Sequence, residues 1–303
     1  MDSLLSICDI KEDVSNIIDL ACDIKAGKKE EKPLEGKTLA MIFQKSSTRT
    51  RVSFDVGMYQ LGGRAIFLSS NDLQMGRGEP ISDTARVLSR FVDGIMIRAI
   101  EHDDVIELAK YSDVPVISGL TNLEHPCQAL ADVLTIKEHF GSFENKKICF
   151  VGDGNNVCNS LLLIAPLLGM DMSVACPKGY EPNEYILKIA QEYAKENNTE
   201  IVISDNLNVA LDNVDVVYTD VWVSMGDEAE AAQRKTDLAP FQVNSDLMAL
   251  ANEGAIFMHC LPAIRGQEVT SEVIDGPQSV IYDEAENRMH AQKAVLYYYL
   301  KDD

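Results

Sequence analysis

Apolar positions along the chain fall into short β-branched runs with helix-like stretches between them. This alternation is typical of βα units arranged around parallel sheets. The strands predicted in the first half are Thr38–Phe43, Ala65–Ser69, Gly94–Ile97 and Pro115–Ser118. Those predicted in the second half are Ile148–Gly152, Met172–Ala175, Glu200–Ile203, Val214–Thr219, Ala255–His259 and Val280–Tyr282.

The length of 303 residues is more than one hydrophobic core comfortably serves. We therefore predict an α/β fold of two doubly wound parallel-sheet domains joined by interdomain helices, with the active site in the cleft between them. Pro126–Phe140, apolar at helical spacing, is the predicted linking helix. A helix at the C-terminus, residues 286–303, is predicted to pack back on the first domain, 1–132, which leaves 133–285 as the second domain.

Two polar segments interrupt this pattern. Asn71–Thr84 contains glycines and is predicted as a loop that ends at an N-cap, Thr84, before the next helix. Trp222–Pro240 is rich in acids and alanine and is predicted as a long irregular segment. A segment of that length is expected to be functional or to form a mobile lid.

The composition, with 46% hydrophobic and 25% charged residues, is that of an ordinary globular protein. A net charge of −21 disfavours binding to nucleic acid or an anionic membrane. The absence of a long apolar run and the acidic start predict no membrane span and no signal peptide, so we expect a cytoplasmic protein. Seven cysteines without a C-x-x-C pair favour reduced thiols, and no metal or cofactor is expected.

The charge is uneven along the chain. From Lys45 to Arg98 there are eight Lys or Arg against five acids, a balance of +3 in a strongly negative protein. Within this region, Phe43–Arg51 reads FQKSSTRTR and follows a predicted strand. Hydroxyls, arginines and free N–H groups at a helix N-terminus together can bind a phosphate. A lone S-T-R would instead be interpreted as a helix cap, but the cluster of donors favours an anion site.

Further candidate groups follow other predicted strands. Arg98 closes the segment GIMIR, and Asp220 follows VDVVYT, so both would lie at carboxyl edges where α/β sheets bind ligands. The segment ICFVGDGNNVCNSLL has the order strand, glycine turn and helix, but Val157 replaces the third glycine of a dinucleotide fingerprint. Structural interpretations compete at each position, namely a salt-bridged Arg98 and an N-cap Asp220.

Taken in order, S-T-R-T-R, H-P-C-Q, G-D-G-N-N, D-V-W-V-S-M-G, H-C-L-P and E-N-R-M-H-A-Q-K-A resemble the aspartate/ornithine carbamoyltransferase family. The resemblance spans the chain and implies carbamoyl phosphate as one substrate. The carbamoyl phosphate residues that it implies are Ser47, Thr48, Arg49, Thr50, Gln74, Arg98, His125, Pro126, Cys127, Gln128, Cys260, Leu261 and Arg288. The catalytic residues that it implies are Arg49, Arg98, His125, Asp220 and Cys260.

The resemblance also implies an acceptor and an assembly. D-V-W-V-S-M-G is specific to the ornithine branch, and H-C-L-P replaces the D-P-L-P-R-like motif of aspartate-specific relatives. Ornithine has a second amine, which the cations of an aspartate site would repel. The implied ornithine-binding residues are Asn156, Asp220, Ser224 and Met225. A homotrimer is implied, with the possibility of higher assemblies, in which Gln74 reaches a neighbouring active site.

Three alternatives remain open from the sequence. The acceptor could be another amine such as putrescine, or aspartate. A Rossmann-type oxidoreductase would need the glycine that Val157 replaces. A non-enzymatic anion-binding module would not need Cys260, Asp220 and the phosphate motif together.

Overall fold

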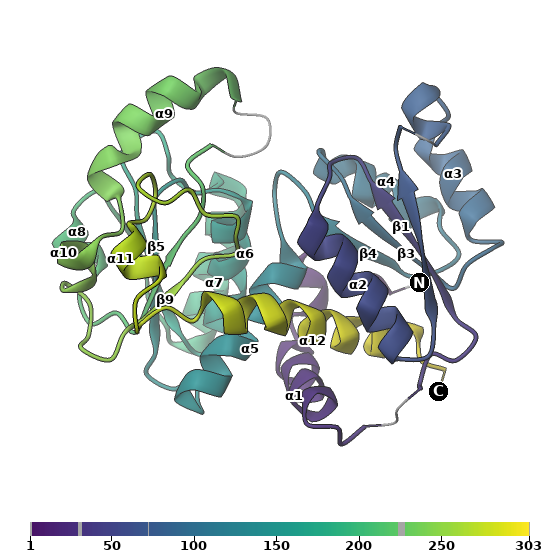
Figure 1. Cartoon of the computed structure of the whole chain (residues 1–303), viewed down its shortest axis with the longest axis horizontal. Helices are drawn as coiled ribbons and strands as arrows, with labels where there is room; N and C mark the ends of the chain where they lie inside the picture. The colour runs from purple at the N-terminus through teal and green to yellow at the C-terminus, as the bar shows by residue number, and fades with distance from the viewer. Residues whose placement is uncertain (1, 30–31, 72, 224–227, 303) are drawn as a thin grey trace. The chain divides into compact units, whose positions relative to one another are not determined.

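The computed structural model describes residues 2–29, 32–71, 73–223 and 228–302. It divides into two compact units, the first formed by 1–134 with 286–303 and the second by 135–285. The sequence predicted a division two residues earlier, between 132 and 133. Each unit contains one parallel sheet with helices, as predicted for the fold class (Figure 1).

Unit 1 holds a four-stranded parallel sheet in the order β2-β1-β3-β4. Its strands are β1 (Thr38–Phe43), β2 (Arg64–Ser69), β3 (Gly94–Arg98) and β4 (Val116–Leu120). Its own helices are η1 (Ile7–Ile10), α1 (Val14–Lys25), α2 (Thr48–Gln60), η2 (Met75–Arg77), α3 (Ile81–Leu88) and α4 (His102–Tyr111). Two helices, α5 (Pro126–Phe140) and α12 (Ile281–Leu300), contain residues of both units.

Unit 2 holds a five-stranded parallel sheet in the order β7-β6-β5-β8-β9. Its strands are β5 (Lys147–Val151), β6 (Asp171–Ala175), β7 (Ile201–Ser204), β8 (Val216–Thr219) and β9 (Ile256–Met258). Its helices are α6 (Asn156–Leu167), α7 (Glu184–Asn197), α8 (Leu207–Ala210), η3 (Glu228–Glu230), α9 (Ala231–Leu238), η4 (Ala239–Phe241), α10 (Ser245–Met248) and α11 (Ser271–Ile274).

Alternating strand residues supply the two faces of the unit 1 sheet. Ala40 and Ile42 of β1 join a core cluster with Val105 and Leu108 of α4. On the other face, Leu39 lies near Leu300, the last residue of α12, since both would contact a Cβ placed on Gly94. Side chains one residue apart on a strand point to opposite faces, so a fully apolar strand is covered by helices on both sides.

The part of α12 that belongs to unit 1, from residue 286 onward, is held there by polar contacts as well as by packing. Lys25 Nζ of α1 donates to Asn287 Oδ1 at 2.8 Å, and Lys293 Nζ donates to Gln60 Oε1 of α2 at 3.0 Å. Figure 1 shows α12, in yellow, beside α1 and α2. These two contacts fix the rotation of α12 about its axis and so determine the direction in which Arg288 points.

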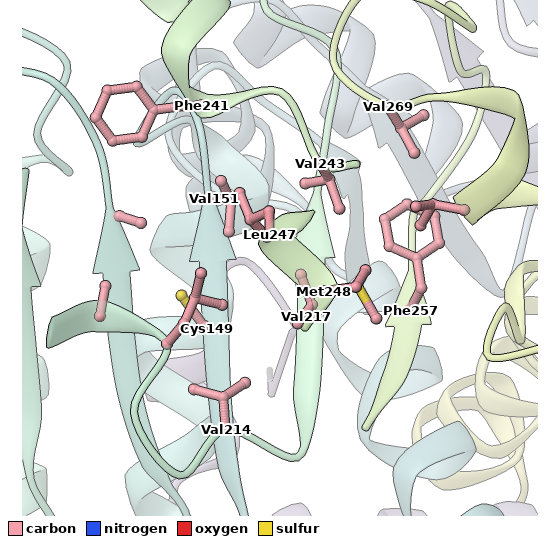
Figure 2. Close-up of a cluster of buried hydrophobic side chains, with 14 of the residues drawn as sticks. Cys149, Val151, Val214, Val217, Phe241, Val243, Leu247, Met248, Phe257 and Val269 are labelled. Carbon is pink, nitrogen blue, oxygen red and sulfur yellow. The ribbon is translucent and has the colours of Figure 1, made fainter. Parts of the chain in front are cut away.

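The core of unit 2 shows the same strand-on-helix packing. Figure 2 shows Cys149 and Val151 of β5 and Val217 of β8 in one buried cluster with Leu247 and Met248 of α10. Burying each such side chain contributes about 1.5–3 kcal/mol relative to leaving it exposed. The sheet that positions the loops of unit 2 is therefore rigidly supported.

The predicted strand Val280–Tyr282 is wrong, because α12 begins at Ile281. Only Ser279 forms a β-bridge, with Phe257, before the chain turns into the helix. Asp283 and Glu284 occupy the first turn of α12, where acidic groups stabilise the helix dipole.

Two other local predictions are also corrected. Helix α3 begins at Ile81, so Thr84 lies inside its first turn, where its hydroxyl donates to Glu79 Oε2 at 2.8 Å. The segment Trp222–Pro240 contains α9, in which only Leu238 is buried. An exposed helix has little apolar periodicity, which is why the sequence pattern missed it. Among the described residues, no helix is long and apolar enough to cross a membrane.

Gly154 provides a test of packing in unit 2. A Cβ at this position would lie 2.4 Å from the backbone nitrogen of Pro182, which cannot move without shifting the chain. We expect Gly154→Ala to lower the free energy of unfolding by about 1–3 kcal/mol, as overpacking does. Gly254→Ala is the control, because its Cβ would meet nothing within 4 Å. Equal urea midpoints for the two variants would contradict this account of the turn.

Candidate active site

The anion-binding motif of unit 1 lies at the carboxyl end of β1. Ser47 has an extended backbone and is the N-cap of α2, where its Oγ accepts a hydrogen bond from Thr50 N at 3.3 Å. Thr48 is exposed and Arg49 is half-buried in the first turn of the helix. Free N–H groups and the positive end of the helix dipole favour an anion at this position.

The strand register brings Arg98 to the same place. β1 and β3 are adjacent parallel strands, and their register pairs Phe43, the last residue of β1, with Arg98, the last residue of β3. Gln44 N also donates to Arg98 O at 2.9 Å. The sheet order reverses between β1 and β3, and open α/β sheets bind ligands at such a switch point.

Two arginines and a serine converge on one threonine hydroxyl. Thr50 Oγ1 lies 3.4 Å from Arg98 Nη1, 2.9 Å from Arg288 Nη2 and 3.0 Å from Ser47 Oγ. Arg98 and Arg288 are only 9% and 4% exposed. Two buried cations held around a neutral hydroxyl create a positive potential that a small anion would relieve.

His125 precedes α5 and is buried beside these arginines. Burial lowers the pKa of His125 well below its ordinary value, and the positive charges of Arg288 and Arg98 lower it further. The imidazole is therefore neutral at neutral pH. A neutral imidazole can donate one hydrogen bond to a carbonyl oxygen as negative charge develops on it.

The remaining residues of the H-P-C-Q motif are anchored in unit 1. Pro126 is the first residue of α5. The Cys127 thiol donates to Ser118 O at 3.4 Å, and burial raises its pKa to about 12, so it stays protonated. Gln128 Nε2 donates to Asp132 Oδ1 at 2.8 Å.

Gln74 is exposed in the connection between β2 and α3, where it is the N-cap residue of η2. Its backbone carbonyl accepts hydrogen bonds from Arg77 N and Glu79 N at 2.8 and 3.0 Å. These bonds order the loop while leaving the Gln74 amide at the surface. The structure thus joins Ser47, Thr50, Arg98 and Arg288 by hydrogen bonds but presents Gln74 on a separate loop.

The switch point of the unit 2 sheet lies between β5 and β8, and polar residues follow both strands. The turn after β5 needs Gly152 because its φ is +124°, a value that L side chains rarely adopt. Asn155 then caps α6, with Oδ1 accepting from Val157 N at 3.0 Å and Cys158 N at 3.1 Å. Asn156 is the first residue of the helix and is partly exposed.

Asp220 follows β8 and receives hydrogen bonds from three directions. Its Oδ1 accepts from Val221 N at 2.8 Å and from Cys260 Sγ at 3.1 Å, and its Oδ2 accepts from Asn155 Nδ2 at 2.8 Å. These contacts join the carboxyl ends of β5, β8 and β9. The half-buried carboxylate can pair with an ammonium group.

The H-C-L-P segment after β9 is held by a buried pair. Leu261 N donates to His259 Nδ1 at 2.9 Å, which leaves the proton on Nε2, 3.2 Å from Glu268 Oε1. His259 and Glu268 are both fully buried. This arrangement holds Leu261 at a left-handed φ of 57° and fixes the direction of the neighbouring Cys260.

Asp220, His259 and Cys260 also have possible ligand atoms within 4.8 Å of one another. Both imidazole nitrogens of His259 are already hydrogen-bonded, to Leu261 N and Glu268 Oε1. A metal ion at this place would have to break one of these bonds. The group is better suited to hold a polar substrate beside Asp220 and Cys260.

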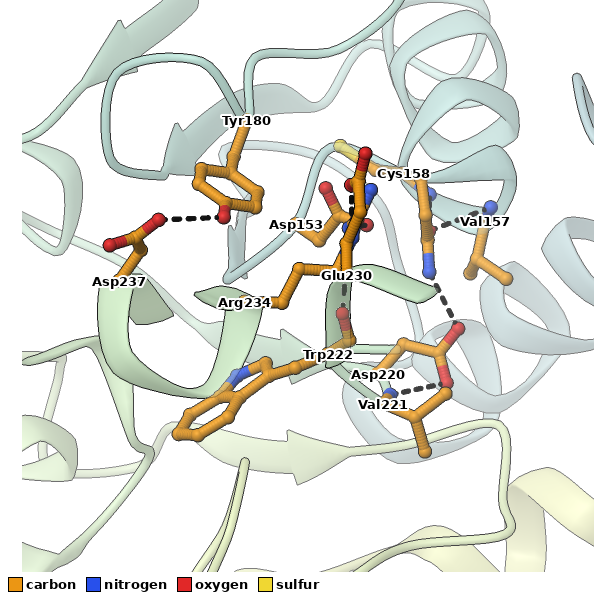
Figure 3. A network of polar contacts seen from close by, with 11 residues as sticks. Asp153, Val157, Cys158, Tyr180, Asp220, Val221, Trp222, Glu230, Arg234 and Asp237 are labelled. Carbon is orange, nitrogen blue, oxygen red and sulfur yellow. Dashed lines mark hydrogen bonds and ion pairs between the residues drawn. The ribbon is translucent and has the colours of Figure 1, made fainter. Parts of the chain in front are cut away.

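Arg234 of α9 contacts the loops that carry the polar residues of unit 2, and the sequence pattern did not identify it. Figure 3 shows its guanidinium between Asp153, 2.7 Å away, and the Trp222 carbonyl, 3.5 Å away. Tyr180 OH donates to Asp237 Oδ2 of the same helix at 2.9 Å. Helix α9 is thereby attached to the loops that follow β5 and β8. Because Arg234 belongs to a helix without an apolar stripe, its spacing gave no signal.

Two predicted ornithine-binding residues, Ser224 and Met225, lie outside the described residues. Trp222, two residues before Ser224 in the sequence, is 3% exposed.

Family models match both halves of the chain. Residues 2–138 match the aspartate/ornithine carbamoyltransferase, carbamoyl-P binding domain, and residues 144–299 match the aspartate/ornithine carbamoyltransferase, Asp/Orn binding domain. The chain belongs to the aspartate/ornithine carbamoyltransferase family. The resemblance on which the sequence analysis relied is confirmed.

Curated relatives of this carbamoyltransferase family match over almost the full chain. The ornithine carbamoyltransferase of Methanobrevibacter smithii is 79% identical over 301 residues, which cover 99% of this chain and 100% of the relative. That of Methanothermobacter thermautotrophicus is 61% identical over 302 residues, 100% of both chains.

Solved structures of the carbamoyltransferase family share the fold. The ornithine carbamoyltransferase from Pyrococcus furiosus has a TM-score of 0.94 at 53% identity and covers 98% of this chain and 96% of its own. The anabolic ornithine carbamoyltransferase from Campylobacter jejuni has a TM-score of 0.93 at 42% identity, with 99% of each chain covered.

The lowered pKa of His125 in this carbamoyltransferase makes stability depend on pH. Below pH about 6.5, the ordinary pKa of histidine, His125 binds a proton in the unfolded chain but stays neutral in the folded protein. The free energy of unfolding should therefore fall as the pH decreases below this value. His125→Asn should make this fall shallower, as measured by urea unfolding between pH 7 and 5 without ligands. His139→Asn, at an exposed position of α5, controls for the loss of an imidazole. Identical pH slopes for wild type and His125→Asn would exclude the linkage.

Proposed function

We propose that this chain transfers the carbamoyl group of carbamoyl phosphate to the δ-amine of L-ornithine, giving L-citrulline and phosphate. The observation that carries the proposal is the convergence of buried Arg98 and Arg288 on Thr50 at the N-terminus of α2, a site suited to a small phosphate anion. Full-length relatives named ornithine carbamoyltransferase support ornithine as the acceptor.

Carbamoyl phosphate would be bound chiefly by groups of unit 1. Arg49, Arg98 and Arg288 would neutralise the phosphate, and His125 would polarise the carbamoyl oxygen. The full proposed set is Ser47, Thr48, Arg49, Thr50, Gln74, Arg98, His125, Pro126, Cys127, Gln128, Cys260, Leu261 and Arg288. Catalysis then rests on orientation and on electrostatic stabilisation of the developing charge.

Ornithine would be bound by groups of unit 2. The Asp220 carboxylate would pair with the α-ammonium, and Asn156 would donate to the amino-acid backbone from the start of α6. Ser224 and the backbone at Met225 would hold the α-carboxylate. Cys260 and the Leu261 carbonyl would contact the reacting amine and the carbamoyl group.

The reaction balances without a cofactor. The lone pair of the neutral δ-amine forms a bond to the carbamoyl carbon, the C–O bond to phosphate breaks, and phosphate leaves with the electron pair. The amine loses one proton, for which the leaving phosphate is the proposed acceptor. Because a primary amine has a reference pKa of about 10.4, activity should rise with pH through the neutral range.

The proposal extends to assembly and cellular role. We infer a homotrimer in which the exposed Gln74 loop reaches the active site of a neighbouring subunit, with carbamoyl phosphate as its ligand. The seven cysteines all lie in the described part of the chain and form no disulfide there, which fits a reducing cytoplasm. A role in arginine biosynthesis is proposed by analogy with the Campylobacter jejuni protein, whose name includes the word anabolic.

Acceptor specificity is tested with the purified protein and carbamoyl phosphate. Ornithine, putrescine, N-acetylornithine and aspartate are supplied in turn, and the carbamoylated product is measured. We expect product from ornithine alone, because the proposed site pairs both an α-ammonium and an α-carboxylate. Turnover of putrescine in preference to ornithine would favour the alternative acceptor, and no product from any amine would refute the proposal.

The phosphate assignment is tested at Arg49. We expect Arg49→Gln to reduce kcat/KM by about 100-fold or more, since it removes a cation that stabilises the departing phosphate. Arg51→Gln is a matched control two residues away, because the Arg51 guanidinium lies 3.8 Å over the Phe67 ring and is exposed. Undiminished activity of Arg49→Gln would remove this residue from the site.

A further inference from the structure

We propose that Asn155 is a positioning residue that fixes the Asp220 carboxylate and directs its Oδ2 oxygen toward the α-ammonium of the acceptor. The inference rests on the proposed function, in which Asp220 binds that ammonium. Of the two adjacent asparagines, Asn156 is the one that the sequence motif implicates in binding the acceptor, and Asn155 has no role there. The hydrogen bonds that Asn155 makes to the start of α6 and to Asp220 assign it a positioning role.

The orientation of the Asn155 amide follows from its capping bonds. Oδ1 accepts from both Val157 N and Cys158 N at the start of α6, at 3.0 and 3.1 Å. A flipped amide would set its NH2 group against these two donors and its oxygen against a carboxylate. The NH2 group must therefore face Asp220, where Nδ2 lies 2.8 Å from Oδ2.

The two oxygens of Asp220 are used unequally. A carboxylate offers about four acceptor positions, two on each oxygen. Oδ1 already accepts from Val221 N and from the Cys260 thiol, whereas among the described residues Oδ2 accepts from Asn155 Nδ2 alone. Within that described part of the chain, one acceptor position is left, and it lies on Oδ2. An incoming ammonium is thereby directed to the oxygen that Asn155 holds.

The three bonds also determine how precisely the carboxylate is aimed. They come from the ends of three neighbouring strands, β5 through Asn155, β8 through Val221 and β9 through Cys260. With the two hydrogen bonds to Oδ1 alone, the carboxylate could still rotate and move Oδ2. Asn155 attaches Oδ2 to the N-terminus of α6, a twelve-residue helix that is largely buried. Loss of this single bond should weaken ammonium binding without unfolding the site.

The chain allows the capping and positioning roles to be separated. Asn155→Ser keeps a side-chain oxygen at the N-cap, where Ser and Asn are about equally good, but is too short to reach Asp220. Asn155→Asp keeps both the length and the cap, and places a second carboxylate against Asp220. Asn206→Ser is the control, since Asn206 also caps a helix of unit 2 and follows the edge strand β7.

The readout is competitive inhibition by two analogues against ornithine, in the presence of carbamoyl phosphate. L-Norvaline carries the α-ammonium and α-carboxylate of ornithine, and pentanoate carries only the carboxylate. We expect Asn155→Ser to raise the inhibition constant of norvaline and the KM of ornithine about tenfold. The constant of pentanoate and the KM of carbamoyl phosphate should stay within about twofold, and Asn155→Asp should show at least the same selective loss.

Other outcomes overturn the inference. Equal losses for norvaline and pentanoate would mean that Asn155 only supports the fold, and unchanged constants would mean that Asp220 is aimed without it. If Asn155→Ser does not fold, Asn155→Asp carries the same comparison. A wild-type protein that forms no citrulline would instead refute the proposed function, which keeps the two failures distinct.

Discussion

The parallel direction of the strands is the constraint on which the candidate site in each unit depends. All carboxyl ends of a parallel sheet lie at one edge, and in each unit the sheet order reverses between two central strands, β1 and β3 or β5 and β8. The connections that follow the two strands of such a pair run to opposite faces of the sheet, so the carboxyl ends of these strands stay uncovered. Thr50 with Arg98 in unit 1 and Asn155 with Asp220 in unit 2 occupy these positions.

The candidate sites of the two units have opposite charge patterns. In unit 1, buried guanidinium groups surround the neutral Thr50 hydroxyl, which concentrates positive charge in a protein of net charge −21. In unit 2, a backbone N–H, a side-chain amide and a thiol, all of them uncharged donors, hydrogen-bond to the Asp220 carboxylate. Buried or partly buried charges are costly unless a ligand or fixed dipoles compensate them, so the site in each unit favours ligand groups of one charge.

The local errors of the sequence interpretation have two physical origins. Val280–Tyr282 begins with two β-branched residues, which favour a strand. The helix-forming residues that follow extend α12 toward the N-terminus, so that the helix already begins at Ile281. α9 buries only Leu238, so the segment lacked the periodicity by which helices are recognised. Thr84 has a hydroxyl that could cap a helix, but it lies inside α3 and donates its hydroxyl proton to Glu79 instead. For Val280–Tyr282 and Thr84, neighbouring residues outweighed the local signal, whereas for α9 the local signal was absent.

The sequence by itself determined nine of the strands, the fold class and the types of chemical group at the strand ends, because these follow from local patterns of polarity and from short motifs. Only the tertiary structure decided which groups meet. Arg288 reaches Thr50 across 238 residues, Arg234 reaches Asp153 across 81, and Asn155 reaches Asp220 across 65. A hydrogen bond requires its two atoms within about 3 Å and in the right direction, and only the folded sheets and helices bring such distant residues that close.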